Sequence, residues 1–439
     1  MCDGCKRCPI VQPSNATPRG RDPKVSASLA ATTTILSMVA GLTPSEQWVT
    51  KLCETAFLRL WTHPNPIGKK DKELCDCLVV CGPHVIIVSV KEIDFKDTGD
   101  KTGWERWHKS AVDKSVQQIR GAERWLKTSD TMQTKSGRTI TLPPHANRHY
   151  HRISVSLGGR GEVPVLWGDF GTGFVHVFDE HSLDVVFTEL DTITDFVSYL
   201  EACEGLVRAG VQPIFNGGGV EDLLAMYVRN GEGFGLPKEA LNSESLIVVG
   251  GSMWESLVNS REYKERSADL QSSYAWDRLI DHYASDLVSG GMLDMHSKEV
   301  TTDELALVAM VLQPRSYRAA LADAFLTFLE SKSEKTASRA AVGDRATAFV
   351  FLAGDSANRE NRTRELALRC LVVRGKCPGV TTVVGIATDR PRGTPGGYSS
   401  DIAYIHFDAL SEEQISKIDA IQDELGYFKN VPWWRSSEA

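Results

Sequence analysis

The sequence has no excess of positive charge and no cysteine framework typical of disulfide-rich proteins. Acidic side chains outnumber basic ones, and the 439 residues carry a formal net charge of −8. A surface coated throughout with basic charge for nucleic acid is therefore excluded, whereas a local basic groove is not. The ten cysteines are scattered, and four lie in or beside apolar runs, where a reduced thiol behaves as a small buried hydrophobe. This use of cysteine predicts a cytoplasmic protein.

Long hydrophobic runs are also missing. A helix that spans a bilayer takes about 20 strongly apolar residues, and no stretch here qualifies, so we expect no membrane partner. Hydrophobic residues make up 42% of the chain and charged residues 24%, a composition typical of folded proteins. The length predicts two or three compact units. Residues 1–42 are expected to be a disordered leader, and the functional chain starts at either Met1 or Met38.

Regular structure is expected to begin at Thr43. Thr43, Pro44 and Glu46 match the pattern of a helix capping box, and apolar residues follow at helical spacing as far as Leu60. Beyond a lysine-rich loop, two apolar runs flank a Cys-Gly-Pro-His segment. This pattern predicts a β-hairpin with a four-residue turn.

The register of this hairpin brings polar side chains together. If Val80 pairs with Val85, Asp76 lies opposite Ser89, and Lys91 lies two residues further on the same face. Charged side chains inside apolar strands are costly to bury unless they are paired or bind a ligand. Two interpretations are open at this point: a functional cluster, or an ordinary cross-strand ion pair at the edge of a sheet.

The next segments complete a simple order of elements. Residues 109–127 carry an apolar stripe at helical spacing, and residues 151–157 alternate as a half-buried strand does. The predicted order is therefore helix, strand, strand, helix, strand.

This order resembles the PD-(D/E)XK nuclease superfamily, through Asp76 on the first core strand and Ser89-Val90-Lys91 on the next. The resemblance covers residues 43–160 and implies a restriction-endonuclease-like mixed sheet flanked by helices. The family usually has an acidic residue where this chain has Ser89. Some restriction endonucleases of the superfamily have Ser-x-Lys and take the missing carboxylate from the following helix. A Gln-x-x-x-Tyr motif, known from another branch, is absent.

The resemblance also implies a role for each residue of the cluster. Hydrolysis of a phosphodiester takes a hard cation, Mg²⁺ or Mn²⁺, held by one or two carboxylates. Asp76 is the first expected ligand, and Lys91 is expected to orient the attacking water. Glu54 on the first helix is the candidate for the second carboxylate, because the family often has a helical Glu there. Glu105 and Glu123, near or on the second helix, are the alternatives. Glu92 is excluded because it points to the opposite face of the sheet.

We expect DNA to contact the second helix. The polar residues assigned to this nucleic-acid face are Gln117, Arg120, Arg124 and Lys127.

The rest of the chain indicates organisation rather than chemistry. We expect a nuclease-like α/β domain over residues 43–165, a mostly helical middle domain over 166–335, and a small C-terminal α/β domain over 346–439. A polar stretch over 331–345 is typical of a linker. The C-terminal domain is a candidate surface for a homodimer or a protein partner.

The sequence thus predicts a metal-dependent nuclease that hydrolyses DNA, in host defence or repair as members of the superfamily do. The alternative is a catalytically inactive nuclease-like fold that serves as a nucleic-acid-binding or protein-interaction module.

Overall fold

The structure, a computed structural model, describes most of the chain from residue 42 onward. Residues 1–41, including Met1 and Met38, lie outside the described residues. The residues that the structure describes are 42–98, 101–159, 167–171, 173–235, 246–289, 300–330, 337–354, 359–389 and 399–429.

The first helix, α1 (Pro44–Phe57), begins at the predicted capping box. The Glu46 amide donates to the Thr43 hydroxyl at 3.3 Å, and the Thr43 amide donates to the Glu46 carboxylate at 2.8 Å. Two of the unsatisfied amides at the helix start are thereby paired. The hydroxyl of Ser45 contacts the carboxylate of Glu92 at the end of the hairpin. This contact fixes the start of α1 beside the sheet.

A six-stranded mixed sheet lies beside α1, in the order β1-β2-β3-β6-β8-β7. The three strands β3, β6 and β8 are parallel, and the other neighbours pair antiparallel. The hairpin and β6 were predicted, whereas β1 and β7 were not. The sheet extends past residue 165, where we expected a domain boundary. Its strands are β1 (Thr62–Pro64), β2 (Cys77–Cys81), β3 (His84–Glu92), β6 (His149–Leu157), β7 (Trp167–Asp169) and β8 (Phe174–Phe178).

Helices cover both faces of this sheet. On one face, α1, α4 (Glu180–Glu189) and α5 (Ile193–Arg208) bury a common core with alternate residues of β2, β3 and β6. On the other face, α3 (Lys114–Leu126) packs its apolar stripe against the remaining alternate residues. The period of two in the strands therefore divides the hairpin cleanly between two cores. The described part of the chain is a mixed α/β fold whose sheet is flanked by helices.

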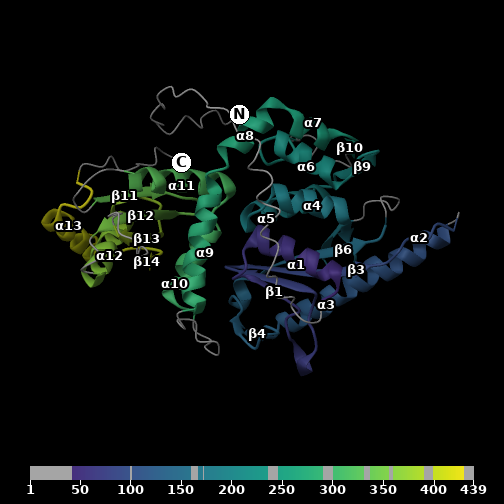
Figure 1. The fold of residues 1–439 in the computed structure, drawn as a ribbon, viewed down its shortest axis with the longest axis horizontal. Helices are drawn as coiled ribbons and strands as arrows, with labels where there is room; N and C mark the ends of the chain where they lie inside the picture. Colours follow the sequence, from purple (N-terminus) through teal and green to yellow (C-terminus); the bar gives the residue numbers. More distant parts are fainter. Residues whose placement is uncertain are drawn as a thin grey trace, which may run out of the picture. The chain divides into compact units, whose positions relative to one another are not determined.

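One nearly continuous helical run ends in α3, the helix that covers the second face of the sheet (Figure 1). It consists of α2 (Lys101–His108), a π-helical segment over Lys109–Asp113, and α3. Only the part from residue 109 onward was expected. A short hairpin of β4 (Thr131–Gln133) and β5 (Thr139–Thr141) follows α3.

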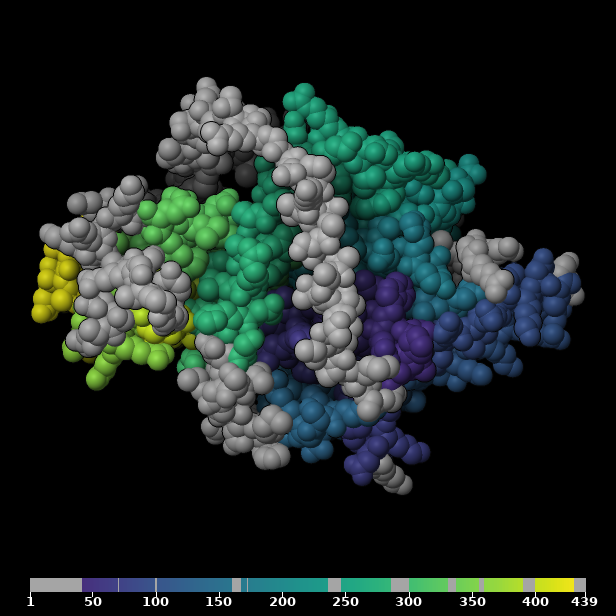
Figure 2. Space-filling model, in the orientation of Figure 1, coloured from purple at the N-terminus to yellow at the C-terminus, as the bar shows by residue number. Residues whose placement is uncertain are grey.

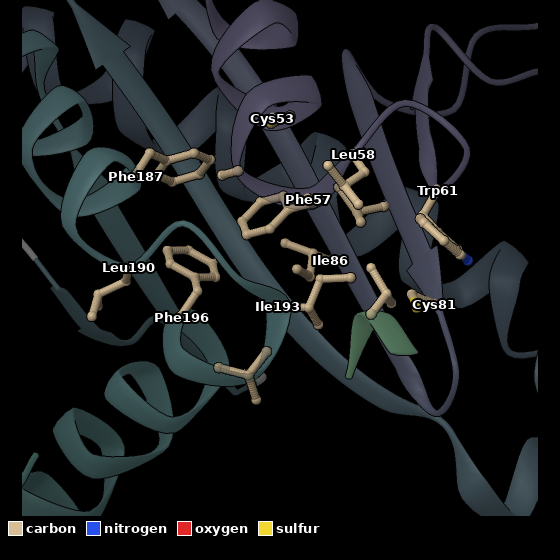
Figure 3. Packing of buried hydrophobic residues seen from close by; sticks show 14 of the residues in the cluster. Cys53, Phe57, Leu58, Trp61, Cys81, Ile86, Phe187, Leu190, Ile193 and Phe196 are labelled. Carbon is tan, nitrogen blue, oxygen red and sulfur yellow. The ribbon is translucent and has the colours of Figure 1, made fainter. Parts of the chain in front are cut away.

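An aromatic cluster joins α1 to the next two helices. Phe57 of α1 lies 5.3 Å from Phe187 of α4 and 5.2 Å from Phe196 of α5, measured between ring centroids. Phe187 and Phe196 are 4.9 Å apart. The three rings face one another above Ile86 of the hairpin (Figure 3). The helices that follow the sheet therefore share its core.

The middle region is mostly helical, as predicted, and it also contains a two-stranded parallel sheet. Its elements after α5 are β9 (Gln212–Asn216), α6 (Val220–Arg229), β10 (Leu246–Gly250), α7 (Met253–Asn259), α8 (Arg261–Asp269), α9 (Ser273–Ser289), α10 (Thr302–Val311) and α11 (Arg315–Glu330).

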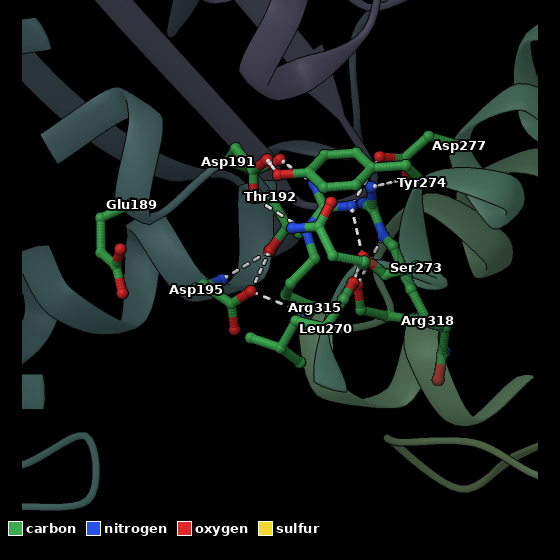
Figure 4. A network of polar contacts seen from close by, with 12 residues as sticks. Glu189, Asp191, Thr192, Asp195, Leu270, Ser273, Tyr274, Asp277, Arg315 and Arg318 are labelled. Atoms are coloured by element: carbon green, nitrogen blue, oxygen red, sulfur yellow. Dashed lines mark hydrogen bonds and ion pairs between the residues drawn. The ribbon is translucent and has the colours of Figure 1, made fainter. Parts of the chain in front are cut away.

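A buried ion network ties these helices together. Arg315 of α11 donates to Asp191 at 2.8 Å and to Asp277 of α9 at 2.6 Å. Arg318 donates to the second oxygen of Asp277 at 2.6 Å. The ring of Tyr274 lies over the guanidinium of Arg315 and its hydroxyl donates to Asp191 (Figure 4). Each buried charge in this group has a partner of opposite sign.

The C-terminal part is a four-stranded mixed sheet with two helices. Strand β11 occupies part of the stretch expected to be a linker. Ring centroids of Trp276 on α9 and Phe349 on β12 are 5.1 Å apart, so this sheet packs against the middle helices. Its elements are β11 (Ala337–Val342), β12 (Thr347–Gly354), α12 (Arg359–Lys376), β13 (Thr382–Asp389), β14 (Ser400–His406) and α13 (Glu412–Leu425).

One hydrophobic core runs through all three expected regions. It includes Val49 of α1, Trp276 of α9 and Ile386 of β13. The described residues from Thr43 onward accordingly form one compact unit. Among the described residues, no helix is both long enough and apolar enough to cross a bilayer.

Candidate functional site

The hairpin has the register that the sequence predicted. Val80 pairs with Val85, and Cys77 pairs with Val88. Continuing this ladder by one residue brings Asp76, just before β2, opposite Ser89. Ser89 and Asp76 are 0% and 3% exposed, so both polar side chains lie in the interior.

Asp76 is held by three donors. The Val90 amide donates to one carboxylate oxygen, and the ammonium of Lys91 lies 3.4 Å from the same oxygen. The side-chain amide of Gln118 donates to the other oxygen at 3.2 Å. Asp76 and Lys91 therefore do face one another, and a third side chain from α3 completes the group.

Gln118 is the residue that connects the cluster. Its amide oxygen accepts from the Lys91 ammonium at 2.7 Å and from the Ser89 hydroxyl at 2.9 Å. The Lys91 ammonium also donates to the Val90 carbonyl at 3.0 Å. Every heteroatom of the Gln118 amide is thus used to orient another member. We call Asp76, Ser89, Lys91 and Gln118 the hairpin cluster.

The sequence assigned the neighbouring residue, Gln117, to nucleic acid and gave Gln118 no role. Gln117 is exposed, whereas Gln118 is half-buried against β3. A signal was present: Ser115, one helical turn before Gln118, is another polar residue on the sheet-facing side of α3. Ser115 is 0% exposed, and its hydroxyl donates to the Ser89 carbonyl at 3.3 Å. Two polar residues three apart on a buried helix face indicate a polar partner on the facing strand.

The π-helical segment lies directly before these two residues. It spans Lys109–Asp113 and ends one residue before α3. A π segment holds an extra residue per turn and so shifts the face that the following helix presents; such segments are frequent at functional sites. It sets the rotation of α3 about its own axis, so that Ser115 and Gln118 face β3.

A second carboxylate lies beside Asp76, and it is Glu73 rather than any of the predicted residues. Partial burial, the nearby carboxylates of Asp76 and Glu46, and a hydrogen bond with Asp76 raise the pKa of Glu73, while Lys135 acts to lower it. Two carboxyl groups this close repel when both are ionised, unless a proton or a cation lies between them. Glu73 precedes Asp76 by only three residues, yet it was not among the residues predicted for the site.

The acidic residues predicted to complete the site have other surroundings. Glu54 on α1 pairs with Arg59 at 3.4 Å. Glu105 is exposed on α2, which Figure 2 shows at the surface in blue. Glu123 accepts two hydrogen bonds from Arg152, at 2.6 and 2.7 Å, and a third from Lys127. Within the described residues, none of the three has a hydrogen bond or ion pair with Asp76.

The charge state of Glu123 follows from these contacts. Burial acts to raise its pKa, but the hydrogen bonds from Arg152 and Lys127 hold the pKa of Glu123 below its usual value. It is therefore an ionised partner of two cations.

The predicted nucleic-acid residues on α3 divide into two kinds. The guanidinium of Arg120 donates to the Phe170 carbonyl, and Lys127 pairs with Glu123 at 2.7 Å. Both cations are thus engaged within the protein. Arg124 and Gln117 are exposed, and in the described part of the chain Arg124 has no ion pair.

The fit of a divalent cation can be judged from the donors present. No group of three or more His, Cys, Asp and Glu side chains among the described residues is arranged to hold a metal ion. Mg²⁺ in phosphoryl-transfer sites is usually held by only one or two carboxylates, with water and substrate phosphate as the other ligands. Asp76 and Glu73 provide such a pair of oxygen donors, and this donor set suits Mg²⁺ or Mn²⁺ rather than a soft metal.

The comparisons with known proteins leave the family open. The chain matches no family profile, no curated protein and no solved structure. The function is therefore argued from the site itself.

Proposed function

We propose that the protein is a metal-dependent nuclease that hydrolyses DNA phosphodiester bonds at the hairpin cluster. The observation that carries the proposal is the convergence of Asp76, Lys91 and Gln118 beside a second carboxylate, Glu73. When β1, α2, the π-helical segment and the β4–β5 hairpin are set aside, the remaining order α1, β2, β3, α3, β6 is the helix, strand, strand, helix, strand order on which the resemblance to PD-(D/E)XK nucleases rests. That resemblance is the argument for DNA as the substrate.

Glu73 offers the second carboxylate that this resemblance otherwise lacks. The family usually has an acidic residue where this chain has Ser89, and the nuclease hypothesis requires the missing carboxylate from elsewhere. Glu73 lies beside Asp76 and is exposed, so it is accessible from solvent. Asp76 and Glu73 would hold a divalent cation between them. When bound, that cation supplies Lewis-acid polarisation of the phosphoryl group and lowers the pKa of a bound water.

The chain's own residues would orient the reacting groups and neutralise the charge that develops on the phosphate. Gln118 and the Val90 carbonyl hold the Lys91 ammonium in place, where a positive charge stabilises the developing charge on a phosphoryl oxygen. The Gln118 amide and the Val90 amide fix the rotation of the Asp76 carboxylate. Side chains fixed in this way need little reorganisation during the reaction.

Cations at the rim offer contacts for the DNA backbone. Lys135 is exposed and close enough to Glu73 to influence its pKa. Arg124 on α3 is exposed as well. Such contacts would position a strand without reading its sequence.

The second candidate function is an inactive nuclease-like fold that binds nucleic acid or a protein. One observation favours it: both oxygens of Asp76 already accept hydrogen bonds, and the residue is only 3% exposed. A buried carboxylate that already accepts three hydrogen bonds has few lone pairs left for a cation.

A cleavage assay separates the two functions. The protein is incubated with supercoiled plasmid and with single-stranded DNA in Mg²⁺, in Mn²⁺ and in chelator. The nuclease proposal predicts nicked or shortened DNA that depends on the divalent ion, and loss of cleavage in Asp76→Ala and Lys91→Ala. Retarded migration of intact DNA in every buffer would support the inactive module instead. Loss of folding in both variants with cleavage per folded molecule unchanged would mean that the ion pair is only structural.

A further inference from the structure

A groove with both polar and apolar walls lies at one end of the hairpin, and the hairpin cluster lies at the other end. The groove has a volume of about 1050 Å³ and includes the turn residues Gly82 and Pro83. Asp76 and Lys91 lie at the other ends of β2 and β3. The groove is bordered by the β4–β5 hairpin and the segment after it, by α10 and by β14. Its size is at the upper end of that of small-molecule pockets, about 300–1,000 Å³.

The guanidinium of Arg138 lines this groove, and little negative charge lies near it. Its side chain is 19% exposed, and the nearest acid is Glu304, whose carboxylate oxygen is 3.9 Å away. The other oxygen of Glu304 already caps α10, where it accepts from the Thr301 amide at 2.8 Å. Within the described residues, the Arg138 guanidinium has no hydrogen bond. No nitrogen of this guanidinium is both buried and unpaired, so its free N–H groups are open to solvent, where an anion can pair with them.

The other charges around the groove do not supply that anion. Arg148 adds a second positive charge, and it is fixed by donating to the carbonyls of Pro143 and Leu126. Asp130 is 85% exposed on its side chain and pairs with His145. Two arginines and two acids line the groove, so their charges balance, but Arg138 is the lining arginine without a hydrogen bond among the described residues.

The remaining walls are apolar and aromatic. Trp61 and Leu142 line one side and Tyr404 another, while Val300 and Leu305 remain 46% and 37% exposed on the third. A concave apolar site with a few converging polar groups is the usual form of a small-molecule site.

We propose that this groove binds a small organic anion with a flat apolar or aromatic body, whose anionic group pairs with Arg138. The inference is independent of the nuclease proposal, because it uses none of the residues of the hairpin cluster. Either one can fail while the other holds.

Two fluorescent probes of similar shape test the proposal on the full-length protein. Anilinonaphthalene sulfonate carries the aromatic body and an anionic group, and N-phenyl-naphthylamine carries the aromatic body alone. We expect saturable binding of one sulfonate probe per chain. Arg138→Gln should raise the Kd of the sulfonate probe on the order of tenfold or more, because a charge-assisted hydrogen bond is lost. The Kd of the neutral probe should stay within about twofold.

Two further variants keep the test decisive. Leu305→Glu adds a negative charge at the rim, where substitution of an exposed side chain leaves the fold intact, and it should also weaken binding of the sulfonate probe. Arg208→Gln, at a position 70% exposed and away from the groove, should leave binding of both probes unchanged. Equal weakening of the two probes by Arg138→Gln, binding unaffected by Arg138→Gln and Leu305→Glu, or no saturable binding by the wild-type protein would overturn the proposal.

Discussion

Among single residues, Gln118 makes the most contacts within the hairpin cluster, since it bonds Asp76, Ser89 and Lys91 together. Its amide does not titrate, and its oxygen already accepts from Lys91 and Ser89, so we assign it the role of positioning Lys91. That role was not predicted, because hairpin register alone does not tell which side chain of the next helix reaches the strands. The choice between Gln117 and Gln118 depends on the rotation of α3, which the π-helical segment before it sets.

Gln118→Leu is expected to slow DNA cleavage on the order of a hundredfold, because misplacement of a reacting group by about 1 Å has an effect of that size. Gln117→Leu, one residue away and exposed, is the matched control and should cleave at the wild-type rate. Initial rates on plasmid DNA at saturating Mg²⁺ provide the measurement. Equal rates for the two variants would show that Gln118 does not position Lys91.

Glu73→Gln is expected to raise the concentration of Mg²⁺ needed for half-maximal cleavage by about tenfold or more, since it removes one of two charged oxygen ligands. Asp71→Asn, an exposed acid two residues earlier, should leave this concentration unchanged. A shift in Glu54→Gln without one in Glu73→Gln would return the second ligand to the residue first predicted.

Four buried histidines make stability depend on pH. Burial lowers the pKa of His63 to about 3, of His151 to about 3 and of His84 to about 4, and it also lowers the pKa of His176. Their unfolded pKa is about 6.5, so the unfolded chain binds more protons in this range. Their contribution to stability is complete above about pH 6.5 and declines as the pH falls toward the folded values.

The free energy of unfolding should therefore decrease steadily from pH 6.5 to pH 4.5. His63→Gln removes one of these groups and should reduce the slope by about 1.4 kcal/mol per pH unit. Urea unfolding at several pH values measures the slope directly. A wild-type free energy of unfolding that is flat across this window would show that these histidines can be protonated in the folded protein.

At the scale of elements, the sequence predicted what local patterns determine. The capping box of α1 and the hairpin register are both confirmed. The three-residue strands β1 and β7 were missed, since so short a strand has no periodicity to detect. Strand β11 was taken for part of a linker because its sequence, Ala-Ser-Arg-Ala-Ala-Val, has no β-branched or aromatic residue before its last position. Which carboxylate approaches Asp76 depends on the path of the chain before β2, and no periodic pattern reports that path.

The packing of α1 on α4 and α5 depends on Phe57, which is 1% exposed. Phe57→Ala should lower the free energy of unfolding by about 3–5 kcal/mol, because a large buried ring is replaced by a cavity. Lys51→Ala, on the exposed side of the same helix, should change it by less than about 0.5 kcal/mol. Urea unfolding compares the two. A loss of less than about 1 kcal/mol for Phe57→Ala would mean that the three rings do not pack as Figure 3 shows.

For the whole molecule, the continuous core and the ion network of Figure 4 make the described residues from Thr43 onward one unit. Arg315→Met leaves Asp191 and Asp277 without this partner and should cost about 3–5 kcal/mol of stability. Arg261→Met breaks an ion pair whose arginine is 85% exposed and should cost less than about 1 kcal/mol. A single unfolding transition shifted by Arg315→Met is expected. Two separated transitions in the wild-type protein would instead support the domain boundaries predicted from the sequence.

The central claim is that the hairpin cluster hydrolyses DNA. Its most direct measurement is the rate at which purified protein nicks supercoiled plasmid in Mg²⁺, compared with Asp76→Asn and with Asp323→Asn, an exposed acid on α11. We predict cleavage by the wild-type protein and by Asp323→Asn, and a loss on the order of a thousandfold in Asp76→Asn when its circular dichroism matches that of the wild type. Equal cleavage by the three proteins, or intact plasmid with all of them, would contradict the account.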